Sequence, residues 1–368
     1  MKIAITADIH IGHNISNSFR IYDSLNSLEQ IKEYCLDNDI QKLFITGDLF
    51  HKRDGFTSLV LCESYKFLET FRDNNIELSI ISGNHDQPYK VFIEGQNNIR
   101  HLADIANVFS EGVYSRKDYG DTTFWFLHWI DDYAKLKPAI SEIYSTMDVR
   151  RKNVLIGHLM MRFFENDNGT YNNTGFSPTI LSRFNKAFLG HLHKHQHKEN
   201  IIYVGSPLEL NFGERKYDHG FCVYDTETGK YEFVKLKYRR FIDYNLKSPD
   251  SITEEMIPEL KEMFENNIVN VHVNKYAPSN ELKSIRETIK ENCSPKILKI
   301  DCAPASIHKN SDVNTTYDSL LIEDDIEKLC LSWLKNSSSI DPEKHAKIIS
   351  MILDIKGQVK STSQEFDI

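Results

Sequence analysis

Five apolar runs in this chain each end at side chains that can bind a metal ion. The candidate ligands are two carboxylates, one amide and four imidazoles: Asp8, His10, Asp48, Asn84, His158, His191 and His193. Four of the five runs reach their ligand through a glycine, which lets the chain turn sharply into a crevice. One such ending is common in proteins, whereas five indicate a single metal-binding crevice.

Buried strands must position these side chains, because the runs are short, rich in β-branched residues and bounded by glycine. Between Met1 and Asp86 the pattern alternates strand, helix, strand, helix, strand, with helices expected over 24–38 and 58–74. This order predicts parallel strands joined by right-handed crossovers. The carboxyl ends of parallel strands meet at one edge of a sheet, so their ligands should converge there.

The later pattern predicts an α/β (α+β) fold, with a two-layer β-sheet core flanked by helices over residues 1–240. Its further strands are expected at 122–127, 154–156, 187–189, 201–204, 221–224 and 231–236. The polar segment 165–174 is rich in Gly and Asn and predicts a surface loop that could face a substrate.

A composition shift after Tyr244 predicts a small αβαβ lobe over residues 241–302. A polar linker at 303–318 follows, then a helical segment at 319–356 and a flexible tail at 357–368. The helical segment contains two amphipathic helices, which either dock on their own protein or bind a helix of a partner.

Seven protein ligands are too many for one ion but suit two ions that share a bridging carboxylate. Two divalent ions against two carboxylates leave a net charge of about +2, which attracts a phosphate and lowers the pKa of a bound water. The mixture of nitrogen and oxygen ligands fits manganese, iron or zinc better than magnesium or calcium.

Three further histidines do not match the pattern of the candidate ligands. His195 and His197 alternate with His191 and His193, and we interpret them as surface histidines. No glycine precedes His128, and Trp129 continues its apolar run, so we expect a structural role there.

The net charge of −9 argues against a protein that coats nucleic acid by bulk charge. The eleven Lys and Arg residues from Arg183 to Arg240 form either a local basic surface or an ordinary solvated face. No apolar stretch is long enough to span a bilayer, and the six cysteines contain no CxxC pair. With a candidate ligand already at Asp8, a cleaved signal peptide is not expected, and we predict a cytoplasmic protein.

The ordered motifs resemble the calcineurin-like metallophosphoesterase pattern over about the first 210 residues. The matching strings are Asp8-Ile-His10, Gly47-Asp48, Gly83-Asn-His-Asp86, Gly157-His158 and Gly190-His-Leu-His193. Within that superfamily, Gly47-Asp-Leu-Phe-His51 is similar to the SbcD-type double-strand-break repair nucleases and their phage recombination counterparts.

The resemblance implies a role for each matching residue. One metal would be held by Asp8, His10, Asp48 and His193, and the other by Asp48, Asn84, His158 and His191. His85 would contact the scissile phosphate and protonate the leaving oxygen, with His51 beside it as a second catalytic contact. Asp86 would either orient a histidine from behind the ligands or cap a helix.

The resemblance also implies a nuclease that uses two divalent ions, most often Mn²⁺, on DNA double-strand ends and single strands in recombination and repair. Its implied partner is an SMC-like ATPase subunit of the SbcC type, bound through the C-terminal helices, and its implied state is a homodimer. Residues 241–302 would be a capping, DNA-binding lobe. The cellular site would be the cytoplasm, or the host cytoplasm for a phage protein.

Two other functions stay open at this point. One is a metallophosphodiesterase or phosphatase acting on a small molecule or a protein. Its protein-phosphatase branch is disfavoured, because the third motif reads Gly83-Asn-His-Asp86 where that branch has a final Glu. The other is a catalytically silent scaffold that binds DNA ends.

Overall fold

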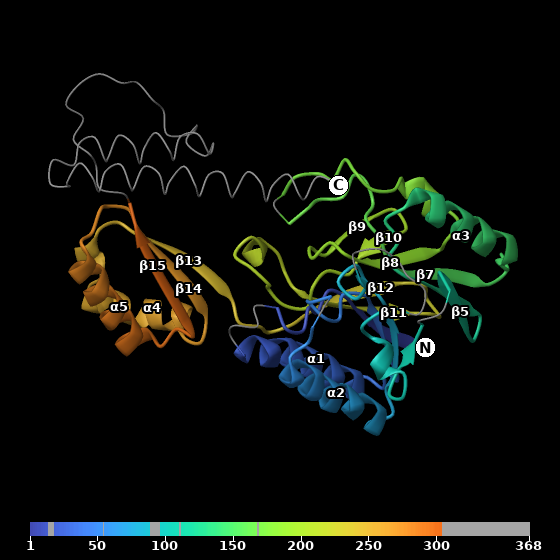
Figure 1. The fold of residues 1–368 in the computed structure, drawn as a ribbon, viewed down its shortest axis with the longest axis horizontal. Coiled ribbons are helices and arrows are strands. Elements are labelled where there is room, and N and C mark those ends of the chain that lie inside the picture. Colours follow the sequence, from blue (N-terminus) through green and yellow to red (C-terminus); the bar gives the residue numbers. More distant parts are fainter. Residues whose placement is uncertain (14–17, 54, 89–95, 110–111, 168, 304–368) are drawn as a thin grey trace, which may run out of the picture. The chain divides into compact units, whose positions relative to one another are not determined.

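The structure is a computed structural model that describes residues 1–13, 18–53, 55–88, 96–109, 112–167 and 169–303. Within this part, two six-stranded sheets pack face to face and carry helices on their outer faces (Figure 1). The predicted linker after Ala303, the partner-binding helices at 319–356 and the tail at 357–368 lie outside the described residues.

The first sheet has the order β12-β11-β1-β2-β3-β4 and carries three of the five motifs. Its strands are β1 (Lys2–Thr6), β2 (Lys42–Thr46), β3 (Glu77–Ile81), β4 (Asn107–Val108), β11 (Gly220–Asp225) and β12 (Tyr231–Lys235). The strands from β1 to β3 are parallel, as predicted, β4 adds a further parallel strand, and β11 joins β1 antiparallel. Helices α1 (Phe19–Asp37) and α2 (Ser58–Asp73) cover its outer face, close to the predicted ranges (Figure 1).

The second sheet has the order β5-β6-β7-β8-β10-β9 and carries the other two motifs. Its strands are β5 (Tyr114–Tyr119), β6 (Thr122–Leu127), β7 (Lys152–His158), β8 (Lys186–Gly190), β9 (Gln196–Lys198) and β10 (Ile201–Tyr203). Helix α3 (Tyr133–Thr146) covers its outer face (Figure 1). Short 3₁₀ turns complete the core: η2 (Arg100–Leu102), η3 (Pro178–Leu181) and η4 (Glu214–Lys216).

Aromatic side chains fill the space between the two sheets. Phe44 of β2 contacts Phe124 and Phe126 of β6, with ring centroids 5.2 and 5.1 Å apart. All three rings are fully buried. Because the central strands are covered on both faces, they read as continuous apolar runs in the sequence. The predicted fold class, a two-layer sheet core flanked by helices, is confirmed.

The lobe that follows has a three-stranded parallel sheet and a hydrophobic core of its own. Its elements are β13 (Phe241–Leu246), η5 (Pro249–Ser251), η6 (Glu254–Met256), α4 (Ile257–Phe264), β14 (Ile268–Val273), α5 (Ser279–Cys293) and β15 (Ile297–Cys302). The predicted αβαβ unit missed β13, which pairs with β14 over its whole length. The lobe is therefore a βαβαβ unit.

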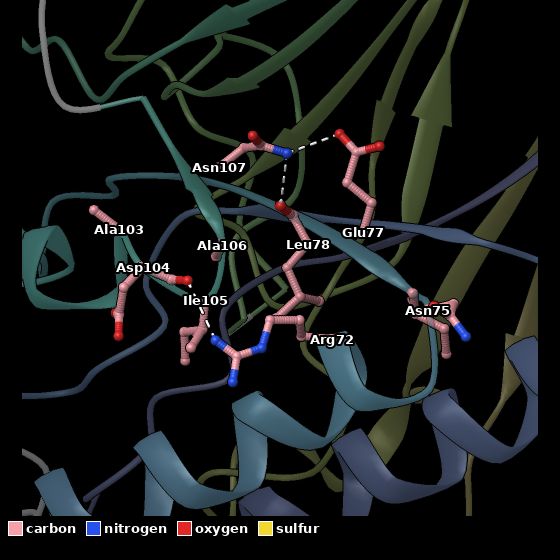
Figure 2. Close-up of a pocket in the computed structure, with 10 residues that line it drawn as sticks. Arg72, Asn75, Glu77, Leu78, Ala103, Asp104, Ile105, Ala106 and Asn107 are labelled. Carbon is pink, nitrogen blue, oxygen red and sulfur yellow. Dashed lines mark hydrogen bonds between the residues drawn. The ribbon is translucent and has the colours of Figure 1, made fainter.

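A cavity of about 420 Å³ lies at the amino end of β3, lined in part by Arg72, Glu77 and Asn107. Figure 2 shows the Asn107 amide donating to the Glu77 carboxylate, at 2.7 Å, and to the Leu78 carbonyl, at 3.3 Å. The predicted metal ligands follow the opposite, carboxyl ends of the strands, and none of them lines this cavity. This cavity therefore belongs to the packing of β4 against β3.

Candidate metal centre

The first two motifs are held together by their backbones at the carboxyl ends of β1 and β2. The Asp8 N–H donates to the Gly47 carbonyl at 3.1 Å, and the His10 N–H donates to the Asp48 carbonyl at 3.0 Å. The two loops therefore continue the strand pairing beyond the sheet and present their side chains to the same space.

One group of candidate ligands combines Asp8, His10 and His193. The Nε2 atoms of His10 and His193 lie 3.3 Å apart, although they come from the loop after β1 and from the loop after β8. The Asp8 carboxylate accepts the His191 N–H with both oxygens at 3.0 Å, which ties the first sheet to the second. These three residues belong to the set that the resemblance implies for one ion. The fourth member of that set is the bridging residue, Asp48.

The other group is centred on Asn84. Its Oδ1 lies 3.1 Å from His158 Nε2 and 2.9 Å from His191 Nδ1. The His158 Nδ1 faces the Thr46 carbonyl at 2.8 Å, and since a carbonyl can only accept, this nitrogen carries the proton. The lone pair of His158 Nε2 is therefore available to a metal.

Asp48 lies between the two groups. Its Oδ2 is 3.6 Å from His10 Nε2 on one side and 3.6 Å from His158 Nε2 on the other. Its Oδ1 accepts the backbone N–H of His85 at 2.7 Å, which fixes the carboxylate in this position. This is the place that a bridging carboxylate would occupy.

Burial disfavours the charged forms of the side chains at this centre. It raises the pKa of Asp48 to about 6 and the pKa of Asp8 well above its ordinary value. Burial also lowers the pKa of His158 to about 3 and keeps the pKa of His191 well below its usual value. These two imidazoles therefore hold free lone pairs, and buried carboxylates that lack water need a cation nearby.

The spacing of the donor atoms fits metal ions. Ligand atoms that each lie about 2.0–2.2 Å from one ion are about 3.0–3.5 Å from each other in ordinary coordination geometries. The cross-strand contacts among the imidazole, amide and carboxylate atoms are 2.9–3.6 Å. Together with the buried charge, this spacing fits the predicted pair of ions.

Four of the predicted ligands hold the backbone in the left-handed region. Their φ angles are 52° at Asp8, 49° at His10, 50° at Asp48 and 102° at His191. Each such non-glycine residue costs on the order of 1–3 kcal/mol and persists only where neighbouring elements enforce it. Strain at several residues of one cluster is typical of functional sites.

The glycines before the ligands serve close packing as well as turning. A Cβ atom at Gly83 would lie 2.1 Å from the Asp48 Oδ1, although the backbone of Gly83 has no positive φ. At Gly47, whose φ is 92°, a Cβ would lie 2.4 Å from His158 Nδ1. At Gly83 the motif therefore requires glycine because the ligands crowd against the backbone.

His85 and His51 border a cavity of about 270 Å³ at the centre. Its lining comprises His10, His13, Asp48, His51, Asn84, His85, Asp167, His191, His193, Leu210 and Asn211. The His85 Nδ1 donates to the His51 carbonyl at 2.6 Å, which leaves Nε2 for another partner. The two rings are stacked with centroids 5.2 Å apart. Asp167 brings the predicted polar loop to this cavity.

Asp86 is fully buried directly behind the ligands. Its carboxylate accepts the backbone N–H groups of Gly83, Leu49 and Phe50, at 3.0, 3.3 and 3.2 Å. The sequence suggested contact with a histidine ring or a helix cap, and these three bonds are to loop backbone instead. Asp86 joins the loop that carries Asp48 to the loop that carries Asn84.

Glu214 was missed by the sequence analysis. It is fully buried and accepts the Nδ1–H of His193 at 2.9 Å and the Leu210 N–H at 2.8 Å. Burial alone would lower the pKa of His193, but the bond and charge of Glu214 raise it to about 10. A carboxylate that fixes the ring in this way leaves His193 Nε2 facing the site.

The structure also tests the interpretation of the other histidines. His128 is fully buried and accepts the Ser82 N–H at 3.1 Å, which fits a structural role. His195 differs from the prediction, because its ring stacks on Phe233 with centroids 4.1 Å apart. His197 is exposed, as predicted.

The stretch rich in Lys and Arg is partly neutralised by ion pairs. Five of its eleven cations pair with carboxylates at 2.5–3.1 Å. The pairs are Lys194–Glu165, Arg215–Asp243, Lys235–Asp218, Arg239–Asp23 and Arg240–Glu209. Because fewer than half of the cations are paired, these contacts do not decide between a local basic surface and an ordinary solvated face.

Comparison with known proteins identifies relatives over most of the chain. The family model for calcineurin-like phosphoesterases matches residues 1–195. Exonuclease subunit 1 of Enterobacteria phage T4 is 25% identical over 249 residues, 67% of this chain and 72% of the relative. The SbcD component of the nuclease SbcCD from Staphylococcus epidermidis is 26% identical over 396 residues, 97% of this chain and all of the relative. DNA double-strand break repair protein Mre11 of Nanoarchaeum equitans is 23% identical over 244 residues, 61% of this chain and 66% of the relative.

We predict that Glu214→Gln weakens metal binding. The neutral amide would no longer hold the ring of His193 by a charged hydrogen bond, and loss of such a partner lowers metal affinity about 10- to 100-fold. Titration calorimetry with Mn²⁺ on the full chain measures the affinity. Glu165→Gln is the control, because Glu165 pairs with Lys194 and should leave the affinity unchanged. Equal affinity in both variants would contradict the role of Glu214.

Proposed function

The chain belongs to the calcineurin-like phosphoesterase family, and from this premise we propose that it is a DNA nuclease of the SbcD type. Phosphoesterases of this family use two metal ions. The observation that carries the proposal is the position of Asp48, whose Oδ2 is 3.6 Å from a histidine of each ligand group. The relatives that support DNA as substrate are the phage exonuclease subunit, the SbcCD nuclease component and Mre11.

In this proposal Asp8, His10, Asp48 and His193 hold one ion, and Asp48, Asn84, His158 and His191 hold the other. The mixed imidazole and oxygen set suits manganese, iron or zinc, and the resemblance to SbcD-type nucleases favours Mn²⁺ among them. When bound, the ions would activate a water molecule and offset charge on the phosphate.

His85 would act on the leaving group in this proposal. Its Nδ1 is engaged with the His51 carbonyl, so Nε2 is the atom that can give a proton to the leaving oxygen. The ring of His51 lies 5.2 Å from the ring of His85 and borders the same cavity, where it would contact the phosphate.

The remaining proposals concern the lobe over 241–302, the protein partner and the cellular location. The lobe over 241–302 would cap the DNA, and residues 319–356 would bind an SMC-like ATPase. We place the protein in the cytoplasm, where reduced thiols persist, because the cysteines of the described residues are free. None of the helices in the described ranges is both long and apolar enough to cross a membrane.

Asp48→Asn and His85→Gln should separate metal binding from turnover. The first variant loses the bridging charge and should lose both tight Mn²⁺ binding and hydrolysis. The second should bind two Mn²⁺ ions per chain and still lose turnover by about 10²- to 10⁴-fold, the usual contribution of a proton donor. Metal analysis of dialysed protein and hydrolysis of bis(p-nitrophenyl) phosphate measure the two effects. Loss of metal from His85→Gln would make His85 a ligand.

The substrate is tested with linear duplex DNA, single-stranded DNA and bis(p-nitrophenyl) phosphate, each with and without Mn²⁺ and the candidate ATPase subunit. We expect Mn²⁺-dependent cleavage of both DNA forms. Hydrolysis of the small diester without any DNA cleavage would indicate a phosphodiesterase and not a nuclease. DNA binding in chelator without cleavage under any metal would make it a scaffold.

A homodimer would form through the exposed apolar side chains of α1 and α2. Tyr22 and Leu36 on α1 are 49% and 46% exposed, and Leu59 on α2 is 39% exposed. We expect a dimeric mass by light scattering and a monomeric mass for Tyr22→Glu combined with Leu59→Glu. A monomeric parent protein would contradict the proposal.

A further inference from the structure

A second cavity, of about 450 Å³, opens near the metal centre. It is lined by Asp131, Tyr133, Arg162, Gly175, Phe176 and Ser177. None of these residues lines the 270 Å³ cavity that contains His51 and His85. The reaction described above assigns none of them a role.

Two short chain segments connect this cavity to the metal ligands. Trp129 follows β6, and its ring lies 4.7 Å from the ring of His191 and 5.7 Å from that of His158. Asp131 is two residues further along, a distance of at most about 7 Å in an extended chain. Arg162 is four residues beyond His158 at the end of β7. The cavity therefore lies beyond the carboxyl ends of β6 and β7, the same ends of the strands at which the metal ligands lie.

The lining offers two aromatic side chains with polar groups beside them. Tyr133, the first residue of α3, is 54% exposed, and its ring lies 6.2 Å from that of the buried Phe176 at an interplanar angle of 32°. The Asp131 carboxylate can accept hydrogen bonds and the Arg162 guanidinium can donate them. A planar heterocycle with donors and acceptors on its edge matches this set.

Arg162 is held in place but not neutralised. Its Nε donates to the Gly175 carbonyl at 2.8 Å. No carboxylate of the described residues lies within 4.0 Å of its guanidinium, in contrast to Arg215, Arg239 and Arg240. A cation in this state beside a phosphoesterase centre has the charge to attract a nucleic-acid backbone.

The neighbouring Phe163 provides an independent sign of function. It holds a φ of 70°, which is an outlier for a bulky side chain, and its ring remains 53% exposed. An exposed aromatic side chain on strained backbone gains nothing from core packing. Strain of this kind is concentrated at ligand-binding segments.

We propose that this cavity binds a nucleobase of a single-stranded substrate, stacked on Tyr133, while the adjacent phosphate occupies the metal centre. The proposal rests on the nuclease function and adds a base subsite to it. Stacking on an aromatic ring accepts every base, so the subsite would favour unpaired strands without selecting a sequence.

The test uses three variants of the full chain: Tyr133→Ala, Tyr133→Leu and Tyr133→Phe. The substrates are a single-stranded oligothymidylate and bis(p-nitrophenyl) phosphate, both with Mn²⁺. We expect Ala and Leu to lower kcat/KM on the oligonucleotide about tenfold or more, because a base stack is lost. Phe should retain the parent rate, and the small diester should be hydrolysed equally by all forms. The exposed position of Tyr133 predicts unchanged thermal midpoints.

An abasic series identifies the contact as a base contact. Removing one base near the scissile phosphate should slow the parent enzyme, while the same removal should cost Tyr133→Ala little more, as expected for two changes to one interaction. Equal oligonucleotide cleavage by the parent and Ala forms would overturn the base subsite alone. A Tyr133→Ala variant that loses activity on the small diester to the same extent would also overturn the base subsite. So would a variant that loses binding to the ATPase subunit but cleaves the oligonucleotide normally. A parent protein that cleaves no DNA would instead overturn the nuclease function.

Discussion

The burial of negative charge at the strand ends is the constraint on which the rest of the structure depends. Asp8 and Asp48 are almost inaccessible to water, and burial raises the pKa of both. Such carboxylates are tolerated when cations lie beside them, and the imidazoles of His158 and His191 hold lone pairs rather than protons. The left-handed backbone at four predicted ligands and the crowded glycines are costs of assembling these groups in one place. The hydrophobic core must offset those costs before any metal binds.

The packing of the two sheets explains how the hydrophobic core holds the ligands in place despite these costs. Asp48 and Asn84 follow strands of the first sheet, whereas His158 and His191 lie at the ends of strands of the second. Neither sheet alone holds a complete ligand group, so the distances between ligands depend on the aromatic layer between the sheets. Close-packed interiors have few alternative arrangements, and a core of Phe rings therefore fixes the spacing of groups far from it. The packing of the two sheets therefore sets the distances between the ligands. The loops mainly determine which residue types serve as ligands.

Sequence patterns revealed the parts of this fold that repeat a local signal. The buried strands are short apolar runs bounded by glycine and helices α1 and α2 have helical periodicity, so these elements were predictable, and the candidate ligands immediately follow the strands. The edge strands β4 and β9 were not predicted, because two and three residues are too few to show a period. Helix α3 was not predicted either, and it contains Pro138. Glu214 was missed because its contact with His193 spans 21 residues without a shared motif. The pairing of the basic stretch was equally invisible, since its carboxylate partners come from distant segments.

The paired cations also constrain how a nucleic acid would be recognised. Duplex binding by surface charge requires free Lys and Arg along the phosphates, and here the net charge is −9 with five cations of the basic stretch paired to carboxylates. Affinity would then have to come from the metal centre itself and from contacts that do not depend on bulk charge. An aromatic surface beside the centre supplies such a contact, because stacking persists at salt concentrations that screen surface charge. A chain of this composition is thus better suited to holding a strand at one or two nucleotides than to coating a duplex.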